Sequence, residues 1–91
     1  MDMRRLVGRN VRRIRLEKGL TQEAFAERSG FSQQYLSSLE RGTRNPTVVT
    51  LFELASALGV SHVALVAPDD ETAAAAPLRR GGRSGTTRNR P

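Results

Sequence analysis

Apolar residues recur at spacings of three and four along the first 67 residues, a pattern typical of helices that bury one face. The first predicted helix runs from about Met3 to Lys18. Its apolar face comprises Leu6, Val7, Val11 and Ile14. No segment alternates apolar and polar residues over the length of a strand, so an all-α fold is expected.

Four further helices are expected, and each begins at a hydroxyl side chain that can cap the free N–H groups of a first turn. These capping residues are Thr21, Ser32, Thr47 and Ser61. A glycine follows each of the first four predicted helices: Gly19, Gly30, Gly42 and Gly59. Pro46 disfavours helix at the residue before it and so marks a loop. The fifth helix is short and contains Leu65, which gives a compact five-helix domain over residues 1–67.

The composition changes at Pro68. Residues 68–91 contain three acidic residues at 69–71, one large apolar side chain, and five arginines between positions 79 and 90. Such a segment cannot bury enough apolar surface to offset the entropy lost on ordering. We therefore expect 68–91 to be a disordered, Arg-rich tail.

Residues 21–42 combine two short predicted helices with a glycine turn. Ala26 lets the two helices cross closely, and Gly30 accommodates positive φ in the turn. Leu36 and Leu39 lie three apart and point from the second helix into the core. The opposite face has no carboxylate and carries Gln33, Gln34, Ser37, Ser38 and Arg41. These features predict a helix-turn-helix unit at 21–42, with a polar recognition helix at about 32–41.

Charge and composition narrow the functional classes. The chain carries 15 Lys and Arg against 9 Asp and Glu, a formal net charge of +6. A basic small protein binds a polyanion such as nucleic acid, or simply has a basic surface. There is no cysteine, and His62 is the one histidine, so no metal-ligand set is present. With no phosphate-loop glycine pattern or nucleophile–base pair either, we expect no enzymatic activity, metal or cofactor.

Targeting signals are also missing from the sequence. No stretch approaches the ~18–20 apolar residues of a membrane span. The basic start is not followed by the apolar run of a signal peptide. A cytoplasmic protein without membrane contact is expected.

The stretch LTQEAFAERSGFSQQYLSSLERGTRNPTVVTLFELASALGVS resembles the helix-turn-helix domain of phage-repressor, Cro and xenobiotic-response-element (XRE) type regulators. The matching pieces are LTQ, the Gly30 turn, LERG, the following NP, and LASALGVS. The resemblance covers about residues 3–66. It implies a lambda-repressor-like DNA-binding domain whose third helix enters the major groove.

Four side chains on the third helix are candidates for base contact. A glutamine amide can pair bidentately with adenine, and the resemblance assigns this role to Gln33 and Gln34. Ser38 projects with Gln34, one turn further on, and Ser37 lies beside it. The alternative for all four is a solvated polar face next to a helix start.

Contacts to the DNA backbone are expected from residues around this helix. Gln22 opens the second helix, where backbone N–H, amide and helix dipole can hold a phosphate. Tyr35 either leans on the sugar-phosphate backbone or covers the edge of the core. Arg44 and Asn45 resemble loop residues that touch phosphates or the minor groove, with a solvated loop as the alternative. Arg41 ends the third helix, where a cation suits the helix dipole.

The resemblance also implies an ion pair between Arg15 and Glu40, linking the first helix to the end of the third. We assign this pair to scaffolding, together with the residues that set the helix crossing. Those residues are Ala26, Gly30, Leu36 and Leu39.

The leading interpretation is a sequence-specific transcriptional regulator of double-stranded DNA, of repressor type. A homodimer on half-sites ~34–36 Å apart is expected, with a contact over residues 59–67 through Val60, Val63, Leu65 and Val66. An alternative is an antitoxin that binds a toxin partner and autoregulates its promoter. Nonspecific nucleoid binding is a third possibility, and it predicts equal affinity for unrelated DNA sequences.

Overall fold

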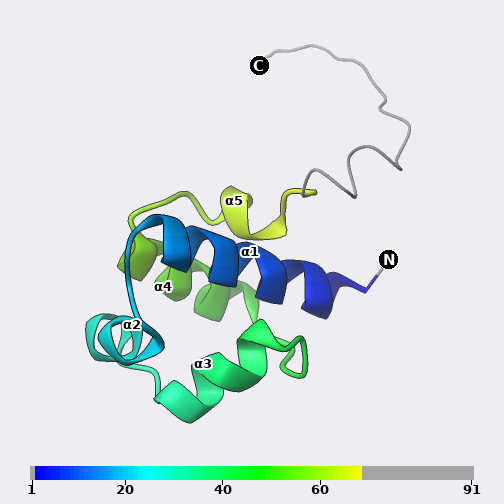
Figure 1. Cartoon of the computed structure of the whole chain (residues 1–91). Coiled ribbons are helices and arrows are strands. Elements are labelled where there is room, and N and C mark those ends of the chain that lie inside the picture. The colour runs from blue at the N-terminus through cyan, green and yellow to red at the C-terminus, as the bar shows by residue number, and fades with distance from the viewer. Residues whose placement is uncertain (1, 69–91) are drawn as a thin grey trace.

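The computed structural model describes residues 2–68, so residues 69–91 of the tail predicted over 68–91 lie outside them. Five helices form this part of the chain, and no strand occurs within it (Figure 1). They are α1 (Met3–Glu17), α2 (Gln22–Ser29), α3 (Gln33–Glu40), α4 (Val48–Leu58) and α5 (Val63–Val66). The prediction of an all-α, five-helix fold is confirmed.

The expected hydroxyl caps hold the starts of α2, α3 and α4. Thr21, Ser32 and Thr47 each accept a hydrogen bond from the backbone N–H three residues further on, at 3.0–3.1 Å. Each of these bonds satisfies one of the free N–H groups at a helix start. The helix boundaries of the central region therefore follow from local hydrogen bonding.

The ends of the described segment differ from the sequence prediction in detail. The carboxylate of Asp2 caps α1 by accepting from the Arg4 N–H at 3.1 Å, a cap that the sequence pattern did not predict. At the other end α5 begins at Val63, with His62 rather than Ser61 in the cap position. Ser61 still accepts from the Val63 N–H through its hydroxyl, at 3.1 Å.

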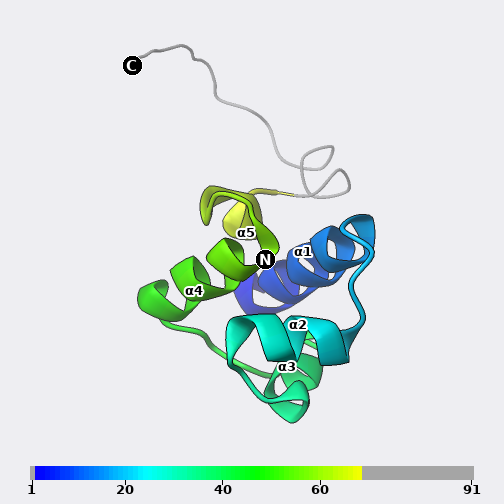
Figure 2. The same cartoon turned by 90° about the vertical axis from the view of Figure 1, so that its left-hand side faces the viewer.

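The α1 helix lies at the centre of the fold. It packs against α3 on one side and α5 on the other, while α2 bridges α3 and α4 (Figures 1 and 2). The whole predicted apolar face of α1 is buried. The largest fully buried apolar side chains come from all five helices and are Leu6, Val11, Phe25, Leu36, Leu39, Leu54, Leu58 and Leu65.

Burial of Leu65 corrects one expectation. This side chain belongs to the core and is fully shielded from solvent, so it is not available for a dimer contact. Val60 and Val66 are half-buried against the same core, which leaves Val63 as the exposed apolar residue of the 59–67 segment.

Backbone contact between α1 and the end of α3 depends on Gly8. A Cβ atom at this position would lie 2.5 Å from the Leu39 carbonyl oxygen and 2.8 Å from that of Glu40. Both distances are below van der Waals contact, so only glycine permits this approach. The close crossing fixes where α3 sits relative to the rest of the domain.

A buried asparagine ties α5 to α1. The Asn10 side chain is fully buried, and its amide donates hydrogen bonds of 2.9 Å to the carbonyl oxygens of both Leu65 and Ala67. Its own carbonyl accepts from the Arg13 guanidinium at 3.1 Å. Because α5 has only four residues, these bonds supply partners that its short backbone ladder does not.

Candidate nucleic-acid interface

The α2–turn–α3 unit has the arrangement that a helix-turn-helix requires. Gly30 ends α2 in the left-handed region, at φ 85°, and its N–H donates to the Ala26 carbonyl. Phe25 from α2 and Leu36 and Leu39 from α3 are fully buried. Since one face of α3 is held in the core, the opposite face must point outward.

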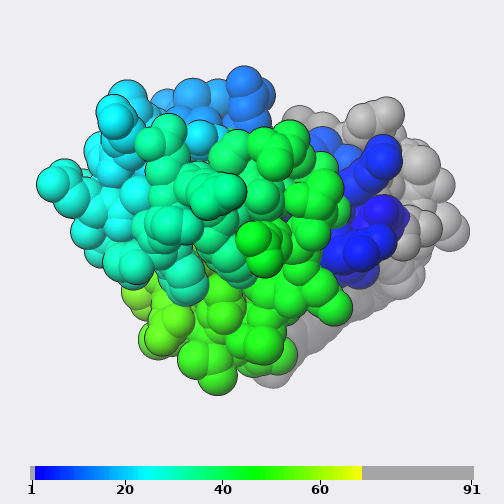
Figure 3. Space-filling view, turned by 90° about the horizontal axis from the view of Figure 1, so that it is seen from below, coloured from blue at the N-terminus to red at the C-terminus, as the bar shows by residue number. Residues whose placement is uncertain are grey.

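The outward face of α3 carries the predicted base-contact residues. Gln33 and Gln34 are exposed, and Ser37 and Ser38 are half-buried one turn further along. Seen from the α3 side, this surface is flanked by α2, by the loop after α3 and by the start of α1 (Figure 3). A shallow depression there is lined by Gln22, Gln33, Gln34, Ser37 and Arg41.

Arg41 lies on this face, where the sequence pattern placed it, and its side chain contacts two serines there. It is the C-cap residue of α3, and its exposed guanidinium folds back along the helix. Nη1 donates to the Ser37 hydroxyl at 2.6 Å, and Nη2 donates to the Ser38 hydroxyl at 3.4 Å. The i, i+4 and i, i+3 spacing of these residues was visible in the sequence and could have identified this arrangement.

A buried ion pair supports the junction of α1, α2 and α3. The Arg15 guanidinium contacts both oxygens of Glu40, at 2.7 Å and 3.1 Å, and also donates to the Leu20 carbonyl at 2.7 Å. The two side chains expose only 8% and 5% of their surface. The ion pair expected between these residues is thus present, and its guanidinium is held by three acceptors.

Gln22 joins this network instead of standing free. Its amide nitrogen donates to a Glu40 oxygen at 3.1 Å. A primary amide has two N–H donors, so one remains for a further partner. The Gln22 backbone N–H lies in the first turn of α2, where helical N–H groups have no intrahelical acceptor.

Aromatic stacking orders the surface beside α3. The rings of Phe31 and Tyr35 stack with centroids 5.2 Å apart, and the Arg44 guanidinium carbon lies 5.2 Å from the Tyr35 centroid. Partial burial raises the pKa of the Tyr35 phenol, and the nearby Arg44 charge lowers it, with a net upward shift. The phenol therefore keeps its proton at neutral pH and can donate a hydrogen bond. Asn45 follows in the exposed loop.

The start of α1 contributes a cation that the sequence pattern did not single out. The left-handed Gly42, at φ 82°, directly follows the end of α3, and the Arg5 side chain packs over it. A Cβ atom at position 42 would lie 2.8 Å from the Arg5 Cγ. The Arg5 side chain remains 73% exposed, so its charge reaches solvent beside the end of α3.

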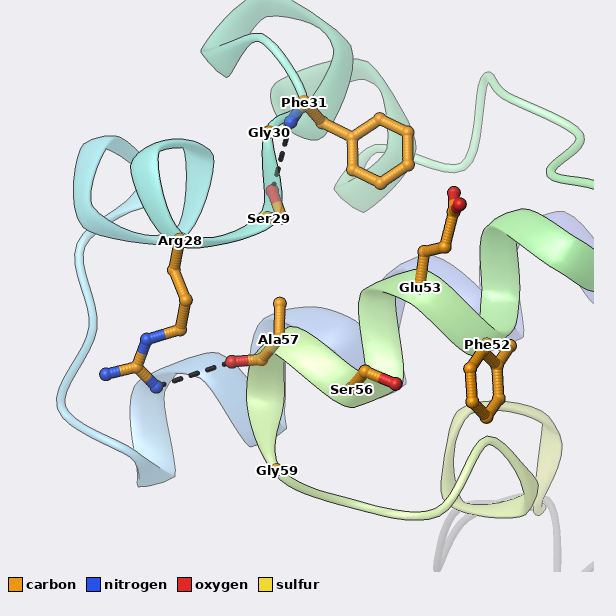
Figure 4. A pocket seen from close by; sticks show the side chains of 9 residues that line it. All are labelled: Arg28, Ser29, Gly30, Phe31, Phe52, Glu53, Ser56, Ala57 and Gly59. Carbon is orange, nitrogen blue, oxygen red and sulfur yellow. Dashed lines mark hydrogen bonds between the residues drawn. The ribbon is translucent and has the colours of Figure 1, made fainter.

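A second concave surface lies between the α2–α3 turn and α4 (Figure 4). Phe31 and Glu53 project into it from opposite sides, and Phe52 forms part of its wall. Arg28 points away from α3 and donates to the Ala57 carbonyl at 3.3 Å. With an acidic side chain and no cluster of cations, this groove is a poor match for a polyanion.

Within residues 2–68, no group of three or more His, Cys, Asp or Glu side chains could hold a metal ion. No helix in the same part of the chain is long and apolar enough to cross a membrane.

Comparison with known proteins places this geometry among gene regulators. The sequence pattern of the family described as helix-turn-helix matches residues 11–65. An uncharacterised HTH-type transcriptional regulator of Sinorhizobium fredii is 76% identical over 72 residues, which cover 79% of this chain and 94% of that protein. The immunity repressor of Bacillus phage phi105 is 42% identical over 60 residues, covering 66% of this chain and 42% of the repressor.

Solved structures give the same result. A hypothetical transcription factor from Neisseria superposes with a TM-score of 0.73 at 32% identity, covering 82% of this chain and 86% of that one. The restriction-modification controller protein C.Esp1396I, solved as a tetramer with its natural 35 base-pair operator, superposes with a TM-score of 0.66 at 37% identity. That match covers 71% of this chain and 86% of the controller protein.

Proposed function

This chain belongs to the helix-turn-helix family of transcription regulators, and we propose that it is a sequence-specific double-stranded DNA-binding repressor. Residues 1–67 are the DNA-binding domain, with the helix-turn-helix unit at 21–42. The Arg-rich segment 68–91 adds attraction to phosphates. The observation that carries the proposal is the outward face of α3, which is polar, free of carboxylates and opposite a face that is buried in the core.

Base reading is assigned to the start of α3. Gln33 and Gln34 are exposed at the N-terminal end of the helix, the part of a recognition helix that contacts base edges. Their amides can pair with adenine, and the hydroxyls of Ser38 and Ser37 can each bond an adjacent base edge. The DNA and α3 would therefore meet through side chains that carry no negative charge.

Backbone contacts would set the register of the complex. Gln22 offers its free backbone N–H and its second amide hydrogen to a phosphate at the α2 N-terminus. Tyr35 offers a protonated phenol, and Arg44 offers a guanidinium that stacking holds beside that phenol. Asn45 offers an amide from the same loop, so these three groups would contact one stretch of sugar-phosphate backbone.

Selection of bound sequences from a random pool of DNA duplexes tests the proposal. Specific readout predicts enrichment of one motif with ~10³-fold or greater preference over unrelated DNA. Gln34→Ala should relax preference at one or two base positions, while Gln33 and the remaining readers preserve the others. A pool that yields no motif would overturn sequence-specific binding, and a uniform loss across all sequences would remove Gln34 from the base readers.

A homodimer would supply the second recognition helix. Four exposed apolar side chains on α4 and α5 are available for the contact: Val48, Val49, Phe52 and Val63, exposed by 79%, 65%, 58% and 58%. Glu53 is the one charged residue of α4, so this face has little to oppose burial. Exposed apolar patches on the order of a few hundred Å² mark interaction sites on proteins, so these side chains are candidates for the contact.

Sedimentation equilibrium tests this contact. The wild-type chain should self-associate at micromolar concentration, and Phe52→Glu should shift it to monomer because a buried carboxylate would face an apolar partner. Lys18→Glu, at an exposed site outside the patch, serves as the matched control. Equal association of both variants would exclude this face. The relatives are transcription regulators and repressors, and nothing in them favours a toxin partner.

A further inference from the structure

We propose that Arg41 is a further base-reading residue of this domain, and that its preferred target is a guanine. The inference deepens the proposed function and rests on it. It starts from the position of the guanidinium, which lies against the outward face of α3 in the same depression as Gln22, Gln33 and Gln34. A C-cap arginine that served only the helix dipole would have no need to reach back to this face.

Two hydroxyls aim the guanidinium. Nη1 donates to Ser37 at 2.6 Å and Nη2 donates to Ser38 at 3.4 Å, so both terminal nitrogens of Arg41 are anchored to α3. Because a guanidinium is planar, two anchored nitrogens restrict the orientation of the whole group. Less side-chain entropy is then lost when it meets a target.

The anchored group keeps the donors that a base requires. A guanidinium has five N–H donors, and the two serine bonds leave three free. A pair of parallel donors matches the O6 and N7 acceptors of guanine, the commonest specific contact in the major groove. Each serine oxygen acts here as an acceptor and keeps its own hydrogen, so the hydroxyls remain able to contact DNA themselves.

No neighbouring carboxylate in residues 2–68 forms an ion pair that would hold Arg41 away from DNA. Glu40 precedes it in sequence, but the Arg15 guanidinium and the Gln22 amide already occupy the Glu40 carboxylate. No ion pair with Arg41 occurs in residues 2–68, and the residue is exposed. The serines are thus positioning residues, and the guanidinium charge remains available to an electronegative base edge.

Selection from a random duplex pool, followed by competition binding, tests the inference with folded full-length variants. The wild-type motif should contain a guanine whose replacement weakens binding ~5- to 150-fold, the range of one bidentate pair. Arg41→Ala should lose preference at that position and keep it elsewhere. Arg41→Lys should retain overall affinity better but discriminate guanine less, because an ammonium lacks the planar fork. Arg28→Ala removes the same charge on the side away from α3 and should leave every preference intact.

The positioning role has its own readout. A variant with Ser37→Ala and Ser38→Ala should lose part of the preference at the guanine position that Arg41→Ala abolishes. In the Arg41→Ala background the same two changes should have no further effect at that position. Equal effects in both backgrounds would show that the serines do not act through Arg41.

Failure of the inference and failure of the proposed function give different results. If the wild-type pool yields a motif and Arg41→Ala preserves every preference while weakening all sequences uniformly, Arg41 contacts phosphate and the inference is overturned. If the wild-type pool yields no motif, sequence-specific binding itself is overturned, and the role of Arg41 as a base reader falls with it.

Discussion

Replacing Asn10 with leucine should destabilise the domain although the site is far from the proposed DNA surface. The change keeps a branched side chain of similar size but removes the two donors that reach the Leu65 and Ala67 carbonyl oxygens, both at 2.9 Å. Water can replace the donor at Ala67, because that bond is only partly buried. The bond to Leu65 is buried, so its oxygen would be left without a partner.

The expected loss can be estimated from these contacts. An orphaned buried polar group costs about 1–3 kcal/mol, and the partly buried oxygen adds to this at the low end of that range. Burial of the additional apolar surface offsets roughly 1 kcal/mol. A net loss of about 1–3 kcal/mol follows for Asn10→Leu, a large share of the ~3–10 kcal/mol typical for a domain of this size. The melting temperature should fall by about 5–20 °C.

Urea unfolding followed by far-ultraviolet circular dichroism measures this loss. The control is Arg13→Ala, which leaves both amide bonds of Asn10 intact and removes only partly or fully exposed contacts to Asn10 and Glu17. It should cost no more than ~1 kcal/mol. The reasoning is refuted if the free energy of unfolding of Asn10→Leu lies within about 0.5 kcal/mol of the wild-type value. The amide bonds to α5 would then contribute little to the stability of the domain.

Three further predictions follow from the scaffold and the charge. Glu40→Ala should lower the free energy of unfolding by about 3–5 kcal/mol in urea because it leaves the buried Arg15 unpaired. Adding Arg15→Met should recover much of that loss. A double variant no more stable than Glu40→Ala would contradict this. Gly8→Ala should cost about 1–3 kcal/mol despite the higher helix propensity of alanine, since its Cβ would lie 2.5 Å from the Leu39 carbonyl; unchanged stability would mean that α1 shifts freely. Deleting residues 79–91 should make log K against log salt shallower by ~0.9 for each phosphate that these arginines neutralise in the full-length complex, and an identical slope would show that they do not touch DNA.

Local sequence signals accounted for most of the secondary structure. The caps at Thr21, Ser32 and Thr47 form as expected because each bond joins residues only three apart. The resemblance to phage-repressor and Cro-type regulators is confirmed by the family match over residues 11–65. The roles assigned to Gln33 and Gln34 remain predictions, since they depend on a partner that the fold alone does not contain.

Apart from the Arg15–Glu40 ion pair, which the family resemblance implied, contacts between distant segments were not predictable in the same way. Nothing local marks Asn10 as the residue that holds α5, because its partners lie 55 and 57 residues further along the chain. Gly8 looks like an ordinary helix glycine until α3 is placed against it. The burial of Leu65 depends on how α5 packs against α1, and the exposure of Phe52 depends on which face of α4 is turned to the core.

The sequence by itself determined the helices, the caps of α2, α3 and α4, the glycine turn and the polar face of α3, because those features depend on periodicity and on hydrogen bonds within one turn. The tertiary structure alone decided how closely α1 approaches α3, what holds α5, and which apolar side chains remain on the surface. The physical reason is that packing and buried hydrogen bonds join residues whose proximity is created only when the helices assemble.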